Sequence, residues 1–389
     1  MSPLCETYLA AEELDRMEPF YPLHVRVCER CFLVQLPEYV PPEEIFSEYA
    51  YFSAYSDTWV EHARRYCQTV IERFQLGRQS MVVEIASNDG YLLQHMVAQE
   101  IPALGIEPAA NVAAEARKRG VETLVSFFGA DLARRLASEG TRADLLIANN
   151  VLSQVPDLHE FASGLETILA PGGVLTLEFH HLLRLIAGRQ LDTIYHEHFS
   201  YFSLHTARAL LSAHGLRVFD VEELPTHGGS LRLYVCHEED GRPEEPAVGT
   251  VARAEAERRL GTLEGYTGFS QAVVEVKRDL LSFLISARRQ GRVVVGYGAP
   301  GKGNTLLNYC GIRSDLLEFT VDRNPYKQGR FLPGTHIPIY HPDKIFSAKP
   351  DFILILPWNI KKEIVDQLSL AREWGARFVV AIPRLEVIE

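Results

Sequence analysis

The sequence has no hydrophobic run long enough to cross a membrane, since none approaches the ~18–20 apolar residues that a span needs. Its first residues, MSPLCETYLAAEELDRM, carry acids and lack the basic region and apolar core of a secretory signal. Cysteine is scarce, because six cysteines in 389 residues, with a single CxxC pair, do not form a disulfide framework. We therefore expect a reduced, cytoplasmic protein without a membrane partner.

Positive charge is also in short supply. The chain has 39 Lys and Arg against 51 Asp and Glu, a formal net charge of −12, and no basic cluster interleaved with aromatic residues. Proteins that bind a nucleic-acid backbone usually present a basic face, so we expect no nucleic-acid partner. The negative net charge does not exclude a small anionic ligand, because helix N-termini and a few well-placed cationic side chains can bind one. The sequence says little about oligomeric state, and a monomer is the expected form.

What the chain does have, from Met81 onward, is a regular alternation of strands and helices. Short links between them predict a parallel sheet covered on both faces, a doubly wound α/β domain. The expected strands are 81–87, 102–108, 121–126, 143–150 and 174–181, followed by a terminal antiparallel pair at 217–225 and 230–237.

Composition divides the chain into three parts. Residues 1–60 form an irregular N-terminal segment with a short strand pair around Cys28 and Cys31, and residues 61–238 form the α/β domain. Residues 239–389 begin with one or two helices over 246–290 and continue as a second α/β unit. Its expected strands are 292–298, 317–322, 351–357 and 376–383.

The first strand of the central domain ends in a motif that favours a nucleotide cofactor. Small residues and a glycine let the backbone pass close to a ligand at a helix N-terminus, and an acid ending the next strand accepts hydrogen bonds from ribose hydroxyls. The residues concerned are Glu84, Ala86, Ser87, Asn88 and Gly90 on the first strand, Glu107 on the second, and Asn149 and Asn150 at the end of the fourth. The motif alone fits a nicotinamide as well as S-adenosylmethionine, but the terminal antiparallel pair favours a methyltransferase and S-adenosylmethionine.

Several strings together resemble one family, the S-adenosylmethionine-dependent C-methyltransferases that act next to the ketone of a TDP-4-keto-deoxysugar. The strings are EIASNDGYLL, YHEHFSYFSLHTARALLSAHGL, LPTHGGSLRLYV, GYGAPGKGNTLLNYCGI and VDRNPYKQGRFLPGTHIPI. The resemblance implies a zinc-binding N-terminal module, a central class I methyltransferase domain with a seven-stranded sheet, and a C-terminal Rossmann-like domain that helps to hold the sugar nucleotide.

The same resemblance implies a catalytic group in the insertion after the fifth strand. It assigns the base to His198, with Tyr195 and Glu197 as neighbours and Tyr49 contributed by the N-terminal part. A histidine near neutral pKa suits removal of an α-proton, and a tyrosine hydroxyl can donate to an enolate oxygen. His196 is interpreted as a packing residue, and two histidines spaced this closely are a poor match for a metal site.

The substrate side leaves several points open. Gln154 stands where the family often has histidine, which leaves the exact position of methylation open: C3 is favoured and C5 is the alternative. His227 either contacts the substrate or shapes the turn into the last strand. The resemblance places Tyr297 and Lys302 near the sugar nucleotide.

Cys28 and Cys31 supply half of a tetrahedral zinc site, which needs two more ligands. Either the module is truncated, or Cys5 and His24, the other nearby ligand types, complete it.

The loop from Gly296 to Gly303 fits GxGxxG, and it fits a P-loop except that Gly303 replaces the Ser or Thr of that motif. With Asp322 ending the next strand, an NAD-dependent sugar oxidoreductase or epimerase is one alternative function. A non-catalytic sugar-nucleotide-binding protein is the other.

Overall fold

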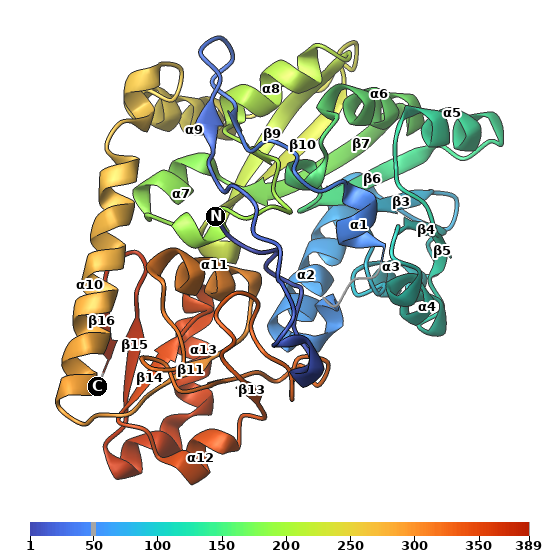
Figure 1. Ribbon diagram of the computed structural model, residues 1–389. Helices are drawn as coiled ribbons and strands as arrows, with labels where there is room; N and C mark the ends of the chain where they lie inside the picture. Colours follow the sequence, from blue (N-terminus) through green and yellow to red (C-terminus); the bar gives the residue numbers. More distant parts are fainter. Residues whose placement is uncertain (48–51, 389) are drawn as a thin grey trace.

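The computed structural model describes residues 1–47 and 52–388. Figure 1 shows two α/β bodies, one above the other, and the N-terminal segment (dark blue) extends from the lower body to the top of the upper body. The upper body holds a seven-stranded sheet and the lower body a six-stranded sheet.

The seven-stranded sheet has the order β5-β4-β3-β6-β7-β10-β9. The first five strands in this order pair in parallel, and β10 pairs antiparallel with both β7 and β9, as the sequence predicts. The strands are β3 (Val82–Ile85), β4 (Ala103–Ile106), β5 (Glu122–Leu124), β6 (Ala143–Asn149), β7 (Leu169–His180), β9 (Leu216–Leu224) and β10 (Ser230–His237).

Helices cover both faces of this sheet because successive strand residues point to opposite sides and both sides are apolar. Val83 and Ile85 pack on one side, with α5, α6, α8 and α9, whereas Val82 packs on the other, with α2 and α3. The helices are α2 (Asp57–Phe74), α3 (Leu93–Val97), α4 (Ala110–Lys118), α5 (Ala130–Ser138), α6 (Leu158–Ile168), α8 (Leu204–Ser212) and α9 (Pro246–Glu257).

The C-terminal sheet has the order β13-β12-β11-β14-β15-β16, parallel except for the last pair. The helical stretch before it forms two helices, α9 and α10 (Phe269–Arg289), within the predicted range. The strands are β11 (Val294–Tyr297), β12 (Thr320–Val321), β13 (Ile339–Tyr340), β14 (Phe352–Ile355), β15 (Arg377–Val380) and β16 (Glu386–Ile388), and the other helices are α11 (Gly301–Cys310), α12 (Lys344–Ala348) and α13 (Lys361–Gln367).

The N-terminal segment ties the two bodies together. Its hairpin, β1 (Arg26–Val27) and β2 (Val34–Gln35), is the predicted strand pair, and β2 also pairs with β8 (Ser200–Tyr201). β8 lies in the insertion after β7, which also contains α7 (Leu182–Ala187), and α1 (Pro42–Phe46) follows the hairpin. At its start the chain bridges from Leu9 to Phe331 in the C-terminal domain.

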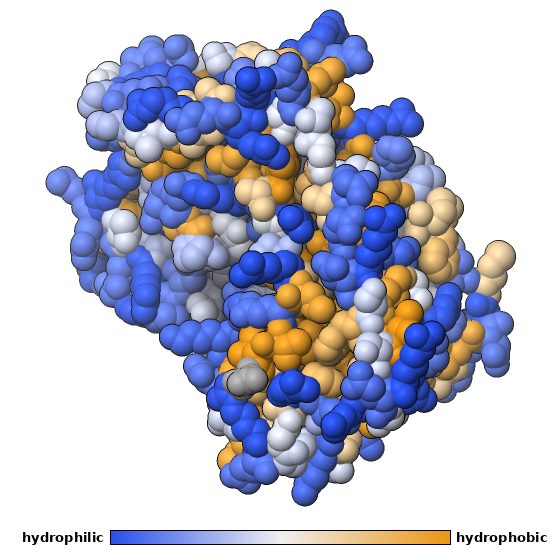
Figure 2. Space-filling view, turned by 90° about the vertical axis from the view of Figure 1, so that its left-hand side faces the viewer, coloured by the Kyte–Doolittle hydropathy of each residue, from blue (hydrophilic) through white to orange (hydrophobic). Residues whose placement is uncertain are grey.

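Figure 2 shows the face of the molecule on the α10 side, largely hydrophilic with an apolar area in its lower half. Among residues 1–47 and 52–388, no helix has the length and hydrophobicity to cross a membrane.

Candidate active site

A cavity of about 920 Å³ lies where the N-terminal segment, the central domain and the C-terminal domain meet. This volume is at the upper end of the range for small-molecule sites, so it has room for a cofactor and a substrate together. Its lining includes most of the residues that the sequence singles out: Ala86, Asn88, Glu107, Asn149, Asn150, Gln154, Tyr195, Glu197, His198, His227 and Lys302.

Six of the predicted site residues do not line the cavity: Glu84, Ser87, Gly90, Tyr297, Cys28 and Cys31. The hydroxyl of Tyr297 donates to Oε1 of Gln367 at 3.0 Å, on the α13 side of the C-terminal sheet. Tyr49 lies outside the described residues, so its predicted role stays a prediction.

At one end of the cavity, the chain turns sharply after β3. Ala86, Asn88 and Gly90 all have positive φ, of 55°, 49° and 77°. A Cβ on Gly90 would lie 3.0 Å from Val121 Cγ2 and 3.2 Å from the Ala116 backbone, so packing as well as φ requires glycine there. This geometry brings the β3 turn against the helix that follows β4.

The acid at the end of β4 is buried in this turn. Both carboxylate oxygens of Glu107 accept backbone N–H groups at 2.9 Å, one from Asn88 and one from Ala109. Burial raises its pKa to about 7, and ribose hydroxyls bound to the carboxylate would favour the charged form. An acid at this place in a doubly wound sheet can accept hydrogen bonds from ribose hydroxyls, so the role predicted for Glu107 stays a prediction that its position allows.

Several buried polar atoms nearby have no protein partner among the described residues. They are Glu84 Oε2, Ser87 Oγ, Asn149 Oδ1 and Asn150 Oδ1, at the carboxyl ends of β3 and β6. Burial, reinforced by the carboxylate of Glu107, raises the pKa of Glu84. Native proteins rarely leave such atoms unpaired, and Asn149 and Asn150 line the cavity, so this end of it fits a polar ligand such as S-adenosylmethionine.

His198 lies farther along the cavity, 4% exposed. Its Nδ1 is 3.0 Å from the carbonyl of Thr193, which assigns the proton to Nδ1 and leaves Nε2 as an acceptor. Burial lowers the pKa of His198 to about 4, despite the bond to Thr193, so the imidazole is neutral at neutral pH. The Tyr195 ring centroid is 4.2 Å away, and burial raises the pKa of this phenol, which keeps it a donor.

Glu197, on the same turn, is buried beside Cys5, whose thiol donates to Oε1 at 3.6 Å. His196 points elsewhere: its Nε2 is 3.1 Å from the carbonyl of Pro22, and its ring packs against Tyr21. Of the YHEH segment, Tyr195, Glu197 and His198 thus line the cavity, whereas His196 packs against the N-terminal segment.

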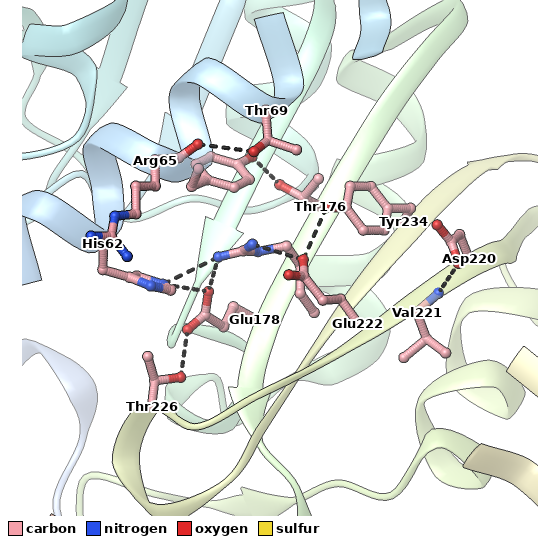
Figure 3. Close-up of polar contacts among 12 residues, drawn as sticks. His62, Arg65, Thr69, Thr176, Glu178, Asp220, Val221, Glu222, Thr226 and Tyr234 are labelled. Carbon is pink, nitrogen blue, oxygen red and sulfur yellow. Dashed lines mark hydrogen bonds and ion pairs between the residues drawn. The ribbon is translucent and has the colours of Figure 1, made fainter. Parts of the chain in front are cut away.

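Sequence reasoning missed a buried ionic network beside the cavity, drawn in Figure 3. The carboxylate of Glu178, at the end of β7, lies 2.7 Å from Arg232 Nη2 and 3.5 Å from His62 Nε2, and it accepts the Thr226 hydroxyl at 3.1 Å. Burial alone would raise the pKa of Glu178, but the bonds and charges of His62 and Arg232 lower it to about 2. The network fixes the start of the turn that carries His227.

His227 and Lys302 line the same cavity, and His180 packs against both His198 and His227. His227 has φ 55°, in the left-handed region, and its ring centroid lies 4.7 Å from that of His180. Lys302 Nζ donates to the carbonyl of His227 at 3.2 Å and sits 5.3 Å from the Trp358 ring. Burial lowers the pKa of Lys302 and the carboxylate of Asp192 opposes this shift; the side chain lines the cavity from the C-terminal domain.

The zinc prediction is met only as a half site. Cys28 and Cys31 lie in the turn between β1 and β2, and within residues 1–47 and 52–388 no group of three or more His, Cys, Asp or Glu side chains is arranged so that it could hold a metal ion. The alternative in which Cys5 and His24 complete the site is wrong, because Cys5 is buried against Glu197 instead. The described residues do not fit a zinc ion.

The sheet order, with its terminal antiparallel pair, defines the class of fold as that of a class I methyltransferase. Three family models match the chain: a "Putative zinc binding domain" over residues 1–46, a "Methyltransferase domain" over 59–221 and a "C-methyltransferase C-terminal domain" over 225–383.

The chain is 34% identical over 387 residues to C-methyltransferase NovU of Streptomyces niveus, covering 100% of this chain and 92% of that protein. It therefore belongs to this family of S-adenosylmethionine-dependent C-methyltransferases.

Solved structures similar to part of the chain include a methyltransferase from Thermotoga maritima and magnesium protoporphyrin IX methyltransferase from Synechocystis with bound SAM. They are 18% and 16% identical, cover 46% of this chain each and 91% and 81% of their own, and give TM-scores of 0.35 and 0.34. At these scores the likeness supports no argument about function.

Proposed function

We propose that this enzyme methylates the carbon next to the ketone of an NDP-4-keto-6-deoxysugar, at C3 in preference to C5. The observation that carries the proposal is the neutral His198, with Nε2 available to accept a proton and its ring against the ring of Tyr195, in the same cavity as the residues proposed for the cofactor. A base and an oxyanion donor side by side are what enolate formation requires.

In this mechanism, His198 Nε2 takes the proton from C3 of the sugar, and the electron pair moves onto the ketone oxygen at C4. The Tyr195 hydroxyl donates to that oxygen as its charge develops. The carbonyl of Thr193 stabilises the imidazolium through Nδ1–H. S-adenosylmethionine supplies the electrophilic methyl group when bound. His198 then releases its proton to solvent and regains the neutral form.

The cofactor and the nucleotide would occupy different ends of the cavity. We assign Asn88, Glu107, Asn149 and Asn150, with Glu84, Ala86, Ser87 and Gly90 supporting them, to S-adenosylmethionine. The buried amino group of Lys302 suits the diphosphate of the sugar nucleotide, and Gln154 and His227 also line the cavity. An uncharged side chain at Gln154 can hydrogen-bond the substrate but cannot exchange a proton, which leaves His198 as the base.

The test replaces His198 with Asn, which retains a polar side chain but cannot act as a base. Loss of a general base costs about 10²–10⁴-fold in rate, so kcat should fall by that factor while calorimetric affinity for S-adenosylmethionine stays unchanged. His196→Asn is the matched control, because His196 is two residues away and buried but faces Pro22 rather than the cavity. Near-normal turnover of the His198 variant on the keto-sugar would refute the assignment.

A further inference from the structure

The C-terminal sheet carries the glycine-rich loop of a dinucleotide-binding fold, but the chain itself supplies the anions there. In such folds the helix N-terminus after the first strand holds a phosphate on its backbone amides. Here the amide of Gly301, the first residue of α11, donates to Glu6 Oε1 at 2.9 Å. The amide of Ala299 donates to Asp322 Oδ2 at 2.7 Å. Two amides of the loop are thus taken by carboxylates of this chain.

The Glu6 carboxylate is built into its surroundings. Its Oε2 lies 3.2 Å from Lys327 Nζ and 2.7 Å from the Tyr8 hydroxyl. Lys327 also donates to the carbonyl of Ala299 at 3.0 Å, and the side chains of Glu6 and Lys327 are only 14% and 6% exposed. Both charged groups are largely shielded from water, so removing one of them would leave the other buried without a counter-charge.

The residues of the loop leave space for the N-terminal segment at the place where a phosphate would bind. A Cβ on Gly301 would lie 2.7 Å from Cys5 Sγ and 3.1 Å from Glu6 Oε1, so glycine here makes room for that segment. One helical turn later, Asn304 Nδ2 donates to the carbonyl of Cys5 at 2.5 Å. The start of α11 therefore binds two consecutive residues of the N-terminal segment.

This attachment reaches the reacting end of the cavity. Glu6 lines the cavity, and the adjacent Cys5 donates its thiol to Glu197, the residue before His198. Figure 1 shows the N-terminal segment extending from the lower body to the upper body, as these contacts require. The segment thus links the C-terminal loop to the turn that carries the proposed base.

We propose that Glu6 is a positioning residue: its carboxylate occupies the glycine-rich loop in place of a phosphate and holds Cys5 against Glu197 at the reacting end of the cavity. The positioning role rests on the proposed function of His198, whereas the occupied loop does not. The glycine-rich loop of the C-terminal domain accordingly binds the N-terminal segment of the same chain and does not bind a dinucleotide.

The test compares Glu6→Gln with Glu12→Gln, a charge-matched control at an exposed residue of the same segment. Hydrogen–deuterium exchange should rise in residues 1–10 and at the start of α11 for Glu6→Gln only. On the keto-sugar, kcat should fall about tenfold or more while KM stays nearly constant, since small misplacements of a reacting group are costly. Affinity for S-adenosylmethionine should not change, because its proposed contacts lie in the central domain.

Wild-type exchange and kcat in Glu6→Gln would overturn the proposal, and raised exchange with wild-type kcat would overturn the positioning role. On the wild-type protein, millimolar NAD should leave the exchange of residues 1–10 unchanged. Faster exchange on adding NAD would mean that a dinucleotide displaces Glu6, and it too would overturn the proposal. If His198→Asn remained active, the proposed function would fail, yet the exchange result would still decide whether Glu6 occupies the loop.

Discussion

Replacing Glu178 with Gln should destabilise the central domain strongly, although Glu178 lies outside the cavity lining. The side chains of Glu178 and Arg232 are 1% and 4% exposed and 2.7 Å apart, so the substitution leaves a buried guanidinium short of its main counter-charge. Removing one partner of a buried pair costs about 3–5 kcal/mol, and the lower end applies here because Glu222 also contacts Arg232, at 3.0 Å.

The pKa shift of Glu178 gives a second, independent way to work out how much stability the substitution removes. The pKa of Glu178 falls from 4.5 to about 2 on folding, and each unit is worth about 1.4 kcal/mol, so ionisation contributes on the order of 3 kcal/mol. Because the folded pKa is depressed, this stability is present above about pH 4.5 and is lost as pH falls towards 2. Gln does not titrate, so the wild type and the variant should converge in that window.

Thermal unfolding, followed from pH 7 down to pH 3, measures the effect. For a domain of the size of the central domain, a loss of about 3 kcal/mol in the free energy of unfolding corresponds to a drop in Tm of about 6–12 °C at neutral pH. Glu222→Gln is the control, because its side chain is 46% exposed and an exposed pair contributes below about 1 kcal/mol. A Glu178 variant no less stable than the Glu222 variant, or a difference that does not shrink with falling pH, would contradict this reasoning.

Two further substitutions separate the ends of the cavity. Gly90→Ala should weaken binding of S-adenosylhomocysteine, measured by calorimetry, by about tenfold or more, because Gly90 has a φ of 77° and the new Cβ would lie 3.0 Å from Val121. Unchanged affinity would argue against this turn as the cofactor site. Lys302→Gln should raise KM for the sugar nucleotide about tenfold or more and leave cofactor affinity unchanged, because a buried cation paired with a diphosphate is lost. An unaltered KM in steady-state kinetics would remove Lys302 from the substrate site.

Much of the fold could be predicted from the sequence because the central strands are apolar runs separated by amphipathic helices. The seven-stranded sheet and its terminal antiparallel pair are confirmed. The pattern gave no sign of β13 and β16, which have two and three residues and carry no periodicity of their own. The proposed domain boundaries stay a prediction.

Candidate site residues could be predicted where they lie at the carboxyl ends of parallel strands. They could not be predicted where they meet residues that are far away in the sequence. Asn88 and Glu107 end neighbouring parallel strands, so one edge of the sheet brings them together. Glu178 and Arg232 meet because they are opposite each other in the β7–β10 register, which only a strand alignment could reveal. Glu6 meets Gly301 across most of the chain, and no local pattern signals that contact.

The central claim is that His198 removes a proton from C3 before methyl transfer, and deuterium incorporation tests it most directly. The wild-type enzyme, saturated with S-adenosylhomocysteine in D₂O, should exchange the C3 proton of a TDP-4-keto-6-deoxysugar, as seen by proton NMR. His198→Asn should not, whereas His196→Asn should exchange at the wild-type rate. Exchange at C5 alone, or exchange that persists in His198→Asn, would contradict the account.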